Sequence, residues 1–299
     1  MRAWLLGLGL LTASGQAAPP EVTDLVAVFD TFATRVAPLP GPEQALAFRT
    51  EIGPMLPGAY PRKSTGMDAK IAKAVAEWPD KRPSILAARD RIVTAYQGGT
   101  VRFAKAFPGY APVMPAYVIH SFGQMDGGTR EIEGKTVLIF GADMIAALHG
   151  KNRIEPLVDH ELFHTYHQKF FDGNCEAVWC GMWTEGLAVY VAKRMTPDAT
   201  DDELLLNYPR PIRREVDARL RDAVCNARRE LDSKDAKITG VYFSGNGEGG
   251  PFPPRFGYYL GMKVAERIGK TMLLDRMAKM PAAEVRQRLE ATLGQMARC

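Results

Sequence analysis

Histidine and cysteine are scarce in this chain, and long apolar runs are absent after its first residues. The 299 residues include five histidines and four cysteines, and the net charge is only +4. A charge this small does not argue for binding to nucleic acid, which usually needs a concentrated basic face. A bilayer span needs about 20 apolar residues, so we expect no membrane span in the mature chain. Ordinary shares of hydrophobic (46%) and charged (24%) residues indicate a globular protein.

The N-terminus carries one short apolar run. Arg2 precedes the run from Trp4 to Leu11, and small residues follow at Gly15 and Ala17. A positive start, a short apolar segment and small residues at the cleavage site are typical of a secretory signal peptide. We therefore predict a signal peptide at residues 1–17 and an exported protein, periplasmic or extracellular.

Export places the four cysteines in an oxidising compartment, where an even number favours disulfides. Four cysteines allow three pairings, and the sequence alone does not choose among them. We favour Cys175–Cys180 together with Cys225–Cys299, because the first pair closes a short loop. Zinc binding by these thiols is the alternative, but the chain has no Cys-x-x-Cys pair.

Residues 18–110 are expected to form a helical region. Apolar residues recur there at helical spacing, and prolines and glycines separate the periodic segments. No chemical motif lies in this region, so we interpret its apolar faces as core. The predicted helices cover 21–36, 43–52, 71–78 and 85–96, the last opening at Pro83-Ser84.

The pattern changes after residue 110. Two stretches rich in β-branched and aromatic residues, 115–123 and 135–141, flank Asp126-Gly127-Gly128, which is a strong turn signal. We predict a small antiparallel sheet. His120 within it is interpreted as structural, and Asp143 as the cap of a short helix.

The remaining chain is predicted to be helical, which gives a mostly helical α+β fold. Thr184 is the expected N-cap of its second helix. The arginines of the third helix are interpreted as a solvated face, with contact to an acidic surface as the alternative. The expected helices cover 154–170, 184–195, 212–231, a segment after 253–261 that ends at about residue 268, and 271–293.

The helix of residues 154–170 contains the motif His-Glu-x-x-His at His160, Glu161 and His164. Histidines at i and i+4 share one face of a helix, so both imidazoles can bind one metal ion. Glu161 can then reach a water on that ion, as the general base of a metallopeptidase does. His167 lies about 10 Å from His160 along the helix axis, too far to share the ion. Phe170 stands where an extended motif would have another histidine.

A catalytic zinc needs three protein ligands, so the third must come from another element. We predict Glu185, which lies on the next helix beside Gly186. Glu176 is the alternative ligand. A glutamate favoured by the helix dipole is the alternative interpretation of Glu185.

With these residues the chain resembles the gluzincin zinc metallopeptidases. Trp183-Thr184-Glu185-Gly186-Leu187-Ala188 is similar to the Trp-x-x-Glu-Gly-x-Ala segment of aminopeptidase-type gluzincins, although one residue shorter between Trp and Glu. The chain is more similar to a family of predicted zinc-dependent proteases, which also carry a segment like Gly257-Tyr258-Tyr259-Leu260-Gly261. The resemblance covers about residues 117–268 and implies a zincin-like region at 111–299, separate from the helical region or continuous with it.

The resemblance implies that His160, His164 and Glu185 bind one Zn²⁺. Glu161 would then be the general base for a zinc-activated water that attacks a peptide bond. Many gluzincins have an acid four residues after the ligand glutamate, to orient the first histidine. Val189 occupies that place here, so the partner of this histidine must lie elsewhere.

A tyrosine hydroxyl can stabilise the oxyanion of such a reaction, and we predict Tyr258 for this role. On a helix Tyr258 shares a face with apolar residues, whereas Tyr259 is expected to point to solvent with Lys263. A packing tyrosine is the alternative. Arg255 is interpreted as a surface arginine, with binding of a substrate carboxylate as the alternative. The strand around residues 136–140 is expected to bind extended substrate by edge pairing.

The sequence thus predicts an exported zinc metallopeptidase acting on peptide or protein substrates. A zinc-binding envelope scaffold or binding protein without catalysis is the alternative, although binding alone does not need Glu161. A third interpretation, an accidental motif in a helical binding domain, predicts no stoichiometric zinc. Hydrolysis of a peptide library, abolished by a chelator, separates the first two.

Overall fold

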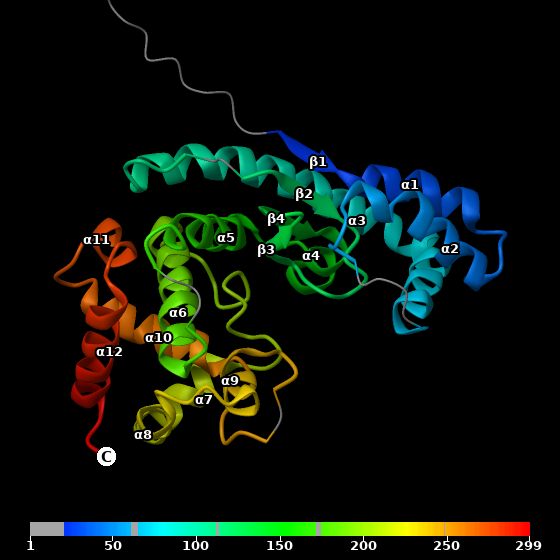
Figure 1. The fold of residues 1–299 in the computed structure, drawn as a ribbon. Coiled ribbons are helices and arrows are strands. Elements are labelled where there is room, and N and C mark those ends of the chain that lie inside the picture. Colours follow the sequence, from blue (N-terminus) through cyan, green and yellow to red (C-terminus); the bar gives the residue numbers. More distant parts are fainter. Residues whose placement is uncertain (1–20, 61–64, 112–113, 172–174, 248) are drawn as a thin grey trace, which may run out of the picture.

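A computed structural model of the chain describes residues 21–60, 65–111, 114–171, 175–247 and 249–299. Over these residues the fold is α+β and mostly helical, as predicted, with one small sheet (Figure 1). The predicted signal peptide at residues 1–17 lies outside the described residues. None of the described helices combines the length and the apolar character needed to cross a bilayer.

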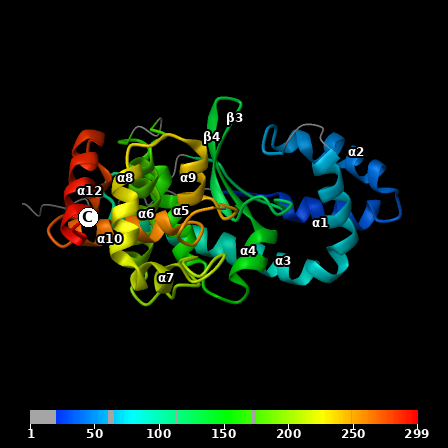
Figure 2. The same ribbon diagram turned by 90° about the horizontal axis from the view of Figure 1, so that it is seen from below.

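The N-terminal region is built on one long helix, α3 (Thr65–Ala106), and not on the two helices predicted between residues 71 and 96. Pro79 and Pro83 lie inside α3, where we expected an interruption. Both prolines are exposed, so water can satisfy the carbonyl groups that lose their helical partners. The helix bends along its length (Figures 1 and 2) and packs against α1 (Leu25–Val36) and α2 (Gly41–Glu51), which precedes the short 3₁₀ helix η1 (Gly53–Met55).

The sheet has four strands in the order β1-β2-β4-β3: β1 (Val22–Asp24), β2 (Ala116–Ile119), β4 (Lys135–Gly141) and β3 (Gly127–Ile132). Strands β3 and β4 pair antiparallel, but β2 pairs parallel with both β1 and β4. The prediction of an antiparallel sheet is therefore wrong, because the sheet is mixed. Its hairpin turns at Glu133 and Gly134, which have positive φ angles of 50° and 74°, and Gly127 and Gly128 belong to β3.

The described chain after β4 is helical, and four local predictions fail there. The helix predicted over residues 271–293 is two helices, interrupted between Ala278 and Ala282. The predicted N-cap Thr184 lies inside α6, and its hydroxyl donates a hydrogen bond to the Cys180 carbonyl. The helix predicted over residues 212–231 is broken at Arg219. Asp143 does not cap its own helix but accepts hydrogen bonds from the backbone of Ser121 and Gly123. The helices are α4 (Ala142–His149), α5 (Glu155–His167), α6 (Val178–Met195), α7 (Ile212–Ala218), α8 (Leu220–Glu230), α9 (Ala236–Phe243), α10 (Phe256–Ile268), α11 (Leu274–Ala278) and α12 (Ala282–Met296).

Two disulfides and one continuous core hold these elements together. The pairs are Cys175–Cys180 and Cys225–Cys299, as predicted. Buried apolar residues form a single cluster that runs from α1 to α12. His120 follows β2 and is buried against the ring of Phe29, which agrees with its structural interpretation. Helix α6 lies among α5, α9, α10 and α12 and contributes the fully buried Trp183.

Candidate metal centre

Helices α5 and α6 bring together three of the predicted site residues. The two Nε2 atoms of His160 and His164 lie 3.0 Å apart. The Oε2 atom of Glu185 lies 3.4 Å from each of them. Among the described residues, these three form the one group of His, Cys, Asp and Glu side chains whose ligand atoms could share a metal ion.

The three donor atoms fit the bond lengths of zinc. A point equidistant from all three within their plane lies about 1.9 Å from each atom, while zinc bonds to histidine nitrogen and carboxylate oxygen measure roughly 2.0–2.2 Å. The three donors could therefore hold a zinc ion at its ordinary bond lengths. Two imidazoles and one carboxylate are also a known ligand set of catalytic zinc.

The charges around these donors favour a cation. Burial opposes ionisation of His164, but the neighbouring Glu185 carboxylate outweighs it and raises the pKa of His164 to about 9. Burial likewise opposes ionisation of Glu185, yet the two histidines hold the pKa of Glu185 well below its ordinary value. The group of donors therefore binds a proton tightly, and a metal cation can take the place of that proton.

Glycines explain how Glu185 reaches the histidines. Helix α6 crosses α10 at Gly186 and Gly261, which face each other. A Cβ atom added at Gly186 would lie 2.3 Å from the carbonyl carbon of Gly261, and one added at Gly261 would lie 2.0 Å from the Met182 carbonyl oxygen. Only glycine at both positions permits this close approach. The crossing thus fixes α6, with Glu185 on it, against the helix that carries Tyr258.

Glu161 lies beneath the edge of the sheet. Its side chain is buried, and burial raises the pKa of its carboxyl group. Strand β3 meets α5 here, at Gly127, where an added Cβ would lie 2.9 Å from Cγ of Glu161. The absence of a side chain at Gly127 therefore leaves room for the carboxylate beside the metal ligands.

Tyr258 lines the cleft beside the three donors, and Tyr259 does not. The ring of Tyr258 is nearly parallel to the imidazole of His160, with ring centres 6.4 Å apart, and burial raises its pKa. Tyr259 is buried on another face of α10, and its hydroxyl donates a hydrogen bond of 2.7 Å to Asp217. The prediction that Tyr259 points to solvent is wrong, because Asp217 and Arg213 provide a polar environment inside the protein.

His167 and Glu176 remain outside the metal centre. The ring of His167 is stacked between Phe163 and Phe171, its Nδ1–H donates to the Ala278 carbonyl, and burial lowers its pKa to about 4. Glu176 is exposed and does not belong to the group of possible ligands. Val189 is buried beside the cleft, where it offers the histidines no hydrogen bond.

The three donors open into a cleft of about 360 Å³. Its walls come from β3, from α5 and α6, from the segment of residues 203–205 and from the start of α10. Arg255, which we interpreted as a surface arginine, is half-buried and belongs to this wall. Asp126, Glu203 and Arg255 carry charge at the cleft but belong to no recognisable motif. Sequence reasoning missed the first two for this reason.

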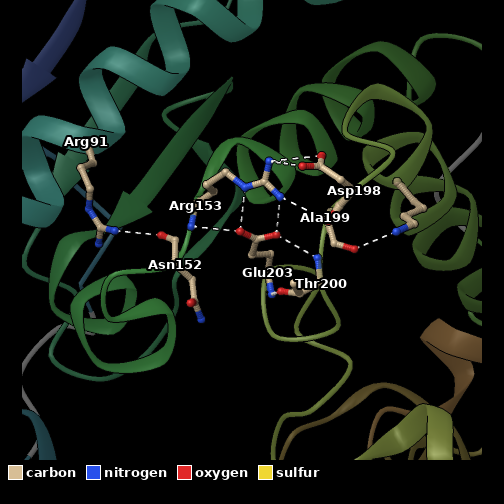
Figure 3. Close-up of polar contacts among 8 residues, drawn as sticks. Arg91, Asn152, Arg153, Asp198, Ala199, Thr200 and Glu203 are labelled. Atoms are coloured by element: carbon tan, nitrogen blue, oxygen red, sulfur yellow. Dashed lines mark hydrogen bonds and ion pairs between the residues drawn. The ribbon is translucent and has the colours of Figure 1, made fainter.

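An ion-pair network holds two sides of the cleft together (Figure 3). Arg153, which precedes α5, donates to both carboxylate oxygens of Glu203 at 2.8 and 2.9 Å and also pairs with Asp198. Asn152, beside it, accepts a hydrogen bond from Arg91 of α3. The segment that carries Leu204 and Leu205 is thereby tied to the start of the helix that carries both histidines.

Comparisons with family models, with curated proteins and with solved structures found no match for this chain. The chemistry of the centre is therefore inferred from its geometry alone.

Proposed function

We propose that the protein is a zinc-dependent metallopeptidase. The observation that carries this proposal is the convergence of His160, His164 and Glu185, from two helices, on one point at zinc-binding distance, with Glu161 buried beside it. A zinc ion supplies Lewis acidity, which polarises a carbonyl group and makes a water molecule more acidic. A site that only bound zinc would not need a buried carboxylate beside the open side of its ligands.

Glu161 and Tyr258 have the chemistry that amide hydrolysis requires. The Glu161 carboxylate accepts a proton from the attacking water and passes it to the leaving nitrogen. The raised pKa of Glu161 suits this exchange, because a carboxylate of ordinary acidity is a weaker base. The Tyr258 hydroxyl keeps its proton and can donate a hydrogen bond to the carbonyl oxygen as negative charge develops there.

The substrate backbone is proposed to pair with β3. Strand β4, which we expected to be the edge, lies between β2 and β3 and has both neighbours already. Strand β3 is the edge strand next to the metal centre, and Gly127, Gly128 and Thr129 border the cleft. An extended peptide can hydrogen-bond to such an edge and lie across the metal ligands.

The protein is further proposed to work outside the cytoplasm. The N-terminal pattern of a signal peptide supports export, and two disulfides are compatible with an oxidising compartment. Peptides or proteins in the periplasm or outside the cell are then its substrates.

A single substitution tests the peptidase function. We expect Glu161→Gln to lower hydrolysis of a mixed peptide library by about 10²–10⁴-fold, because the general base is lost. Zinc should stay at one ion per chain by atomic absorption, since the three ligands remain.

Glu266→Gln, an exposed position on α10, is the matched control and should keep full activity. Unchanged hydrolysis in Glu161→Gln would contradict the role of this residue. One zinc per chain without any hydrolysis by the wild type would favour a scaffold.

A further inference from the structure

Arg255 stands directly before α10 and three residues before Tyr258, with its side chain on the wall of the cleft. Its backbone has a positive φ angle of 67°, which is uncommon for a residue with a side chain. This conformation is one that glycine or asparagine adopts more readily. Arginine therefore occupies this position at some conformational cost.

The guanidinium group is held in place by the protein backbone and by aromatic rings. Its Nη1 atom donates to the carbonyl oxygens of Leu205 at 3.0 Å and of Tyr208 at 3.4 Å. Its central carbon lies 4.4 Å from the ring centre of Tyr258 and 5.9 Å from that of Tyr208. Leu205 itself belongs to the segment that the Arg153–Glu203 pair ties to α5. A guanidinium restrained in this way loses little freedom when it binds a ligand.

Among the described residues, Arg255 lacks the carboxylate partner that Arg153 and Arg213 have. Arg153 and Arg213 each pair with at least one carboxylate. Within the described part of the chain, Arg255 forms no ion pair, and its Nε and Nη2 atoms donate to no carbonyl or carboxylate group. Its positive charge nevertheless acts on the site, because it opposes the rise that burial causes in the pKa of the Tyr258 hydroxyl and, after His149, helps to hold the pKa of Asp126 below its ordinary value.

We propose that Arg255 binds a carboxylate of the substrate and makes the cleft selective for peptides that carry one beside the cleaved bond. The planar guanidinium can form two parallel hydrogen bonds to a carboxylate, and Tyr258 places it next to the metal ligands. The carboxylate belongs either to the C-terminus of the peptide or to an Asp or Glu side chain. This inference rests on the proposed peptidase function for its substrate class.

Two sets of acetylated peptides distinguish the sources of the carboxylate. In the first set each peptide is made with a free C-terminal carboxylate and with a C-terminal amide. In the second set, amidated peptides carry Glu or Gln at each position near the cleaved bond. We expect the wild type to show a kcat/KM at least about tenfold higher for the charged member of the pair in one set, because a charge-assisted hydrogen bond contributes at least that much.

Substitutions at Arg255 should remove this preference. Arg255→Gln is expected to bring the ratio of kcat/KM between charged and neutral peptides close to one, while Arg255→Lys keeps part of it. Arg219→Gln is the matched control, because Arg219 also lies over a ring, at 4.7 Å from Phe252, and donates to a carbonyl, at 3.0 Å from Pro251, but borders no part of the cleft. This control should keep the full preference.

A binding measurement separates this inference from the peptidase proposal. The same peptide pairs are titrated calorimetrically into Glu161→Gln, with and without Arg255→Gln. Tighter binding of the charged peptides that disappears with Arg255→Gln supports the carboxylate site, even if the wild type hydrolyses nothing and the peptidase proposal fails. Hydrolysis with equal rates for charged and neutral peptides overturns the role of Arg255 and leaves the peptidase proposal intact. Equal binding of both members of every pair, without hydrolysis, overturns both.

Discussion

The ionisation of Glu203 affects the stability of the cleft wall. The two hydrogen bonds from Arg153 lower the pKa of Glu203 to about 2, against an ordinary value of 4.5. A carboxyl group with a lowered pKa stabilises the fold above its unfolded pKa, and this contribution is lost as the pH falls from about 4.5 towards 2. The ion pair in Figure 3 is thus fully present at neutral pH.

We expect Glu203→Gln to lower the free energy of unfolding by about 1 kcal/mol at pH 7, because the charge-assisted pair between the buried Glu203 carboxylate and the half-exposed Arg153 is replaced by a weaker neutral one. The difference from the wild type should shrink between pH 4.5 and pH 2. Urea denaturation at pH 7, 5 and 3.5 measures it. Glu290→Gln removes an exposed pair with Arg286 and should cost no more than about 0.5 kcal/mol. A deficit for Glu203→Gln that stays constant with pH would contradict the ion-pair explanation.

The sequence predicts single residues well where local spacing carries the information. The pairing of His160 with His164 follows from the period of one helix, and the structure places their Nε2 atoms 3.0 Å apart. Tyr259 was misjudged because its partners Asp217 and Arg213 lie more than forty residues away along the chain. Arg255 was misjudged for a similar reason, since Leu205 and Tyr208 hold it from a distant segment. Such environments depend on tertiary packing, which one helical period does not encode.

At the scale of elements, the crossing of α6 and α10 has no space for a side chain at either glycine. We expect Gly186→Ala to lower the free energy of unfolding by about 3 kcal/mol, because its Cβ has no space against Gly261. Displacement of α6 should also weaken zinc binding, since Glu185 is the neighbouring residue. Denaturant unfolding and competition with a zinc chelator measure the two effects.

Gly294→Ala is the matched control for this crossing. Gly294 lies inside α12 with no atom within 4 Å of an added Cβ. Alanine should raise the stability there by up to about 1 kcal/mol, because it favours the helix more than glycine does. Equal effects at the two positions would show that helix propensity, and not packing, governs Gly186.

Element boundaries were predicted less well than element types. Pro83 predicts the start of a helix, yet α3 continues through it because both of its prolines face solvent. Thr184 predicts a helix start, yet α6 begins at Val178. Strand β1 was included in a predicted helix because its three residues, Val22–Asp24, are too few to show a strand period. Strand β1 forms through its parallel pairing with β2, which lies more than ninety residues later in the chain.

At the scale of the whole molecule, the two disulfides close loops of very different length. Cys225 and Cys299 are 74 residues apart, whereas Cys175 and Cys180 are five apart. Closure of the longer loop removes more freedom from the unfolded chain. We expect Cys225→Ser with Cys299→Ser to lower the free energy of unfolding by about 4 kcal/mol, and the corresponding pair at Cys175 and Cys180 by about 2 kcal/mol. Guanidinium denaturation of both double variants measures the difference, and the reverse order would contradict an origin in loop closure.

The crossing of Gly186 and Gly261 limits how this protein can diverge in evolution. Most packed positions can drift in pairs, because a larger side chain on one element is compensated by a smaller one opposite. Glycine has no smaller replacement, so neither position can accommodate a gain at the other. Lineages that keep Glu185 and Tyr258 on crossing helices are therefore expected to keep both glycines, whatever changes occur in the rest of the core.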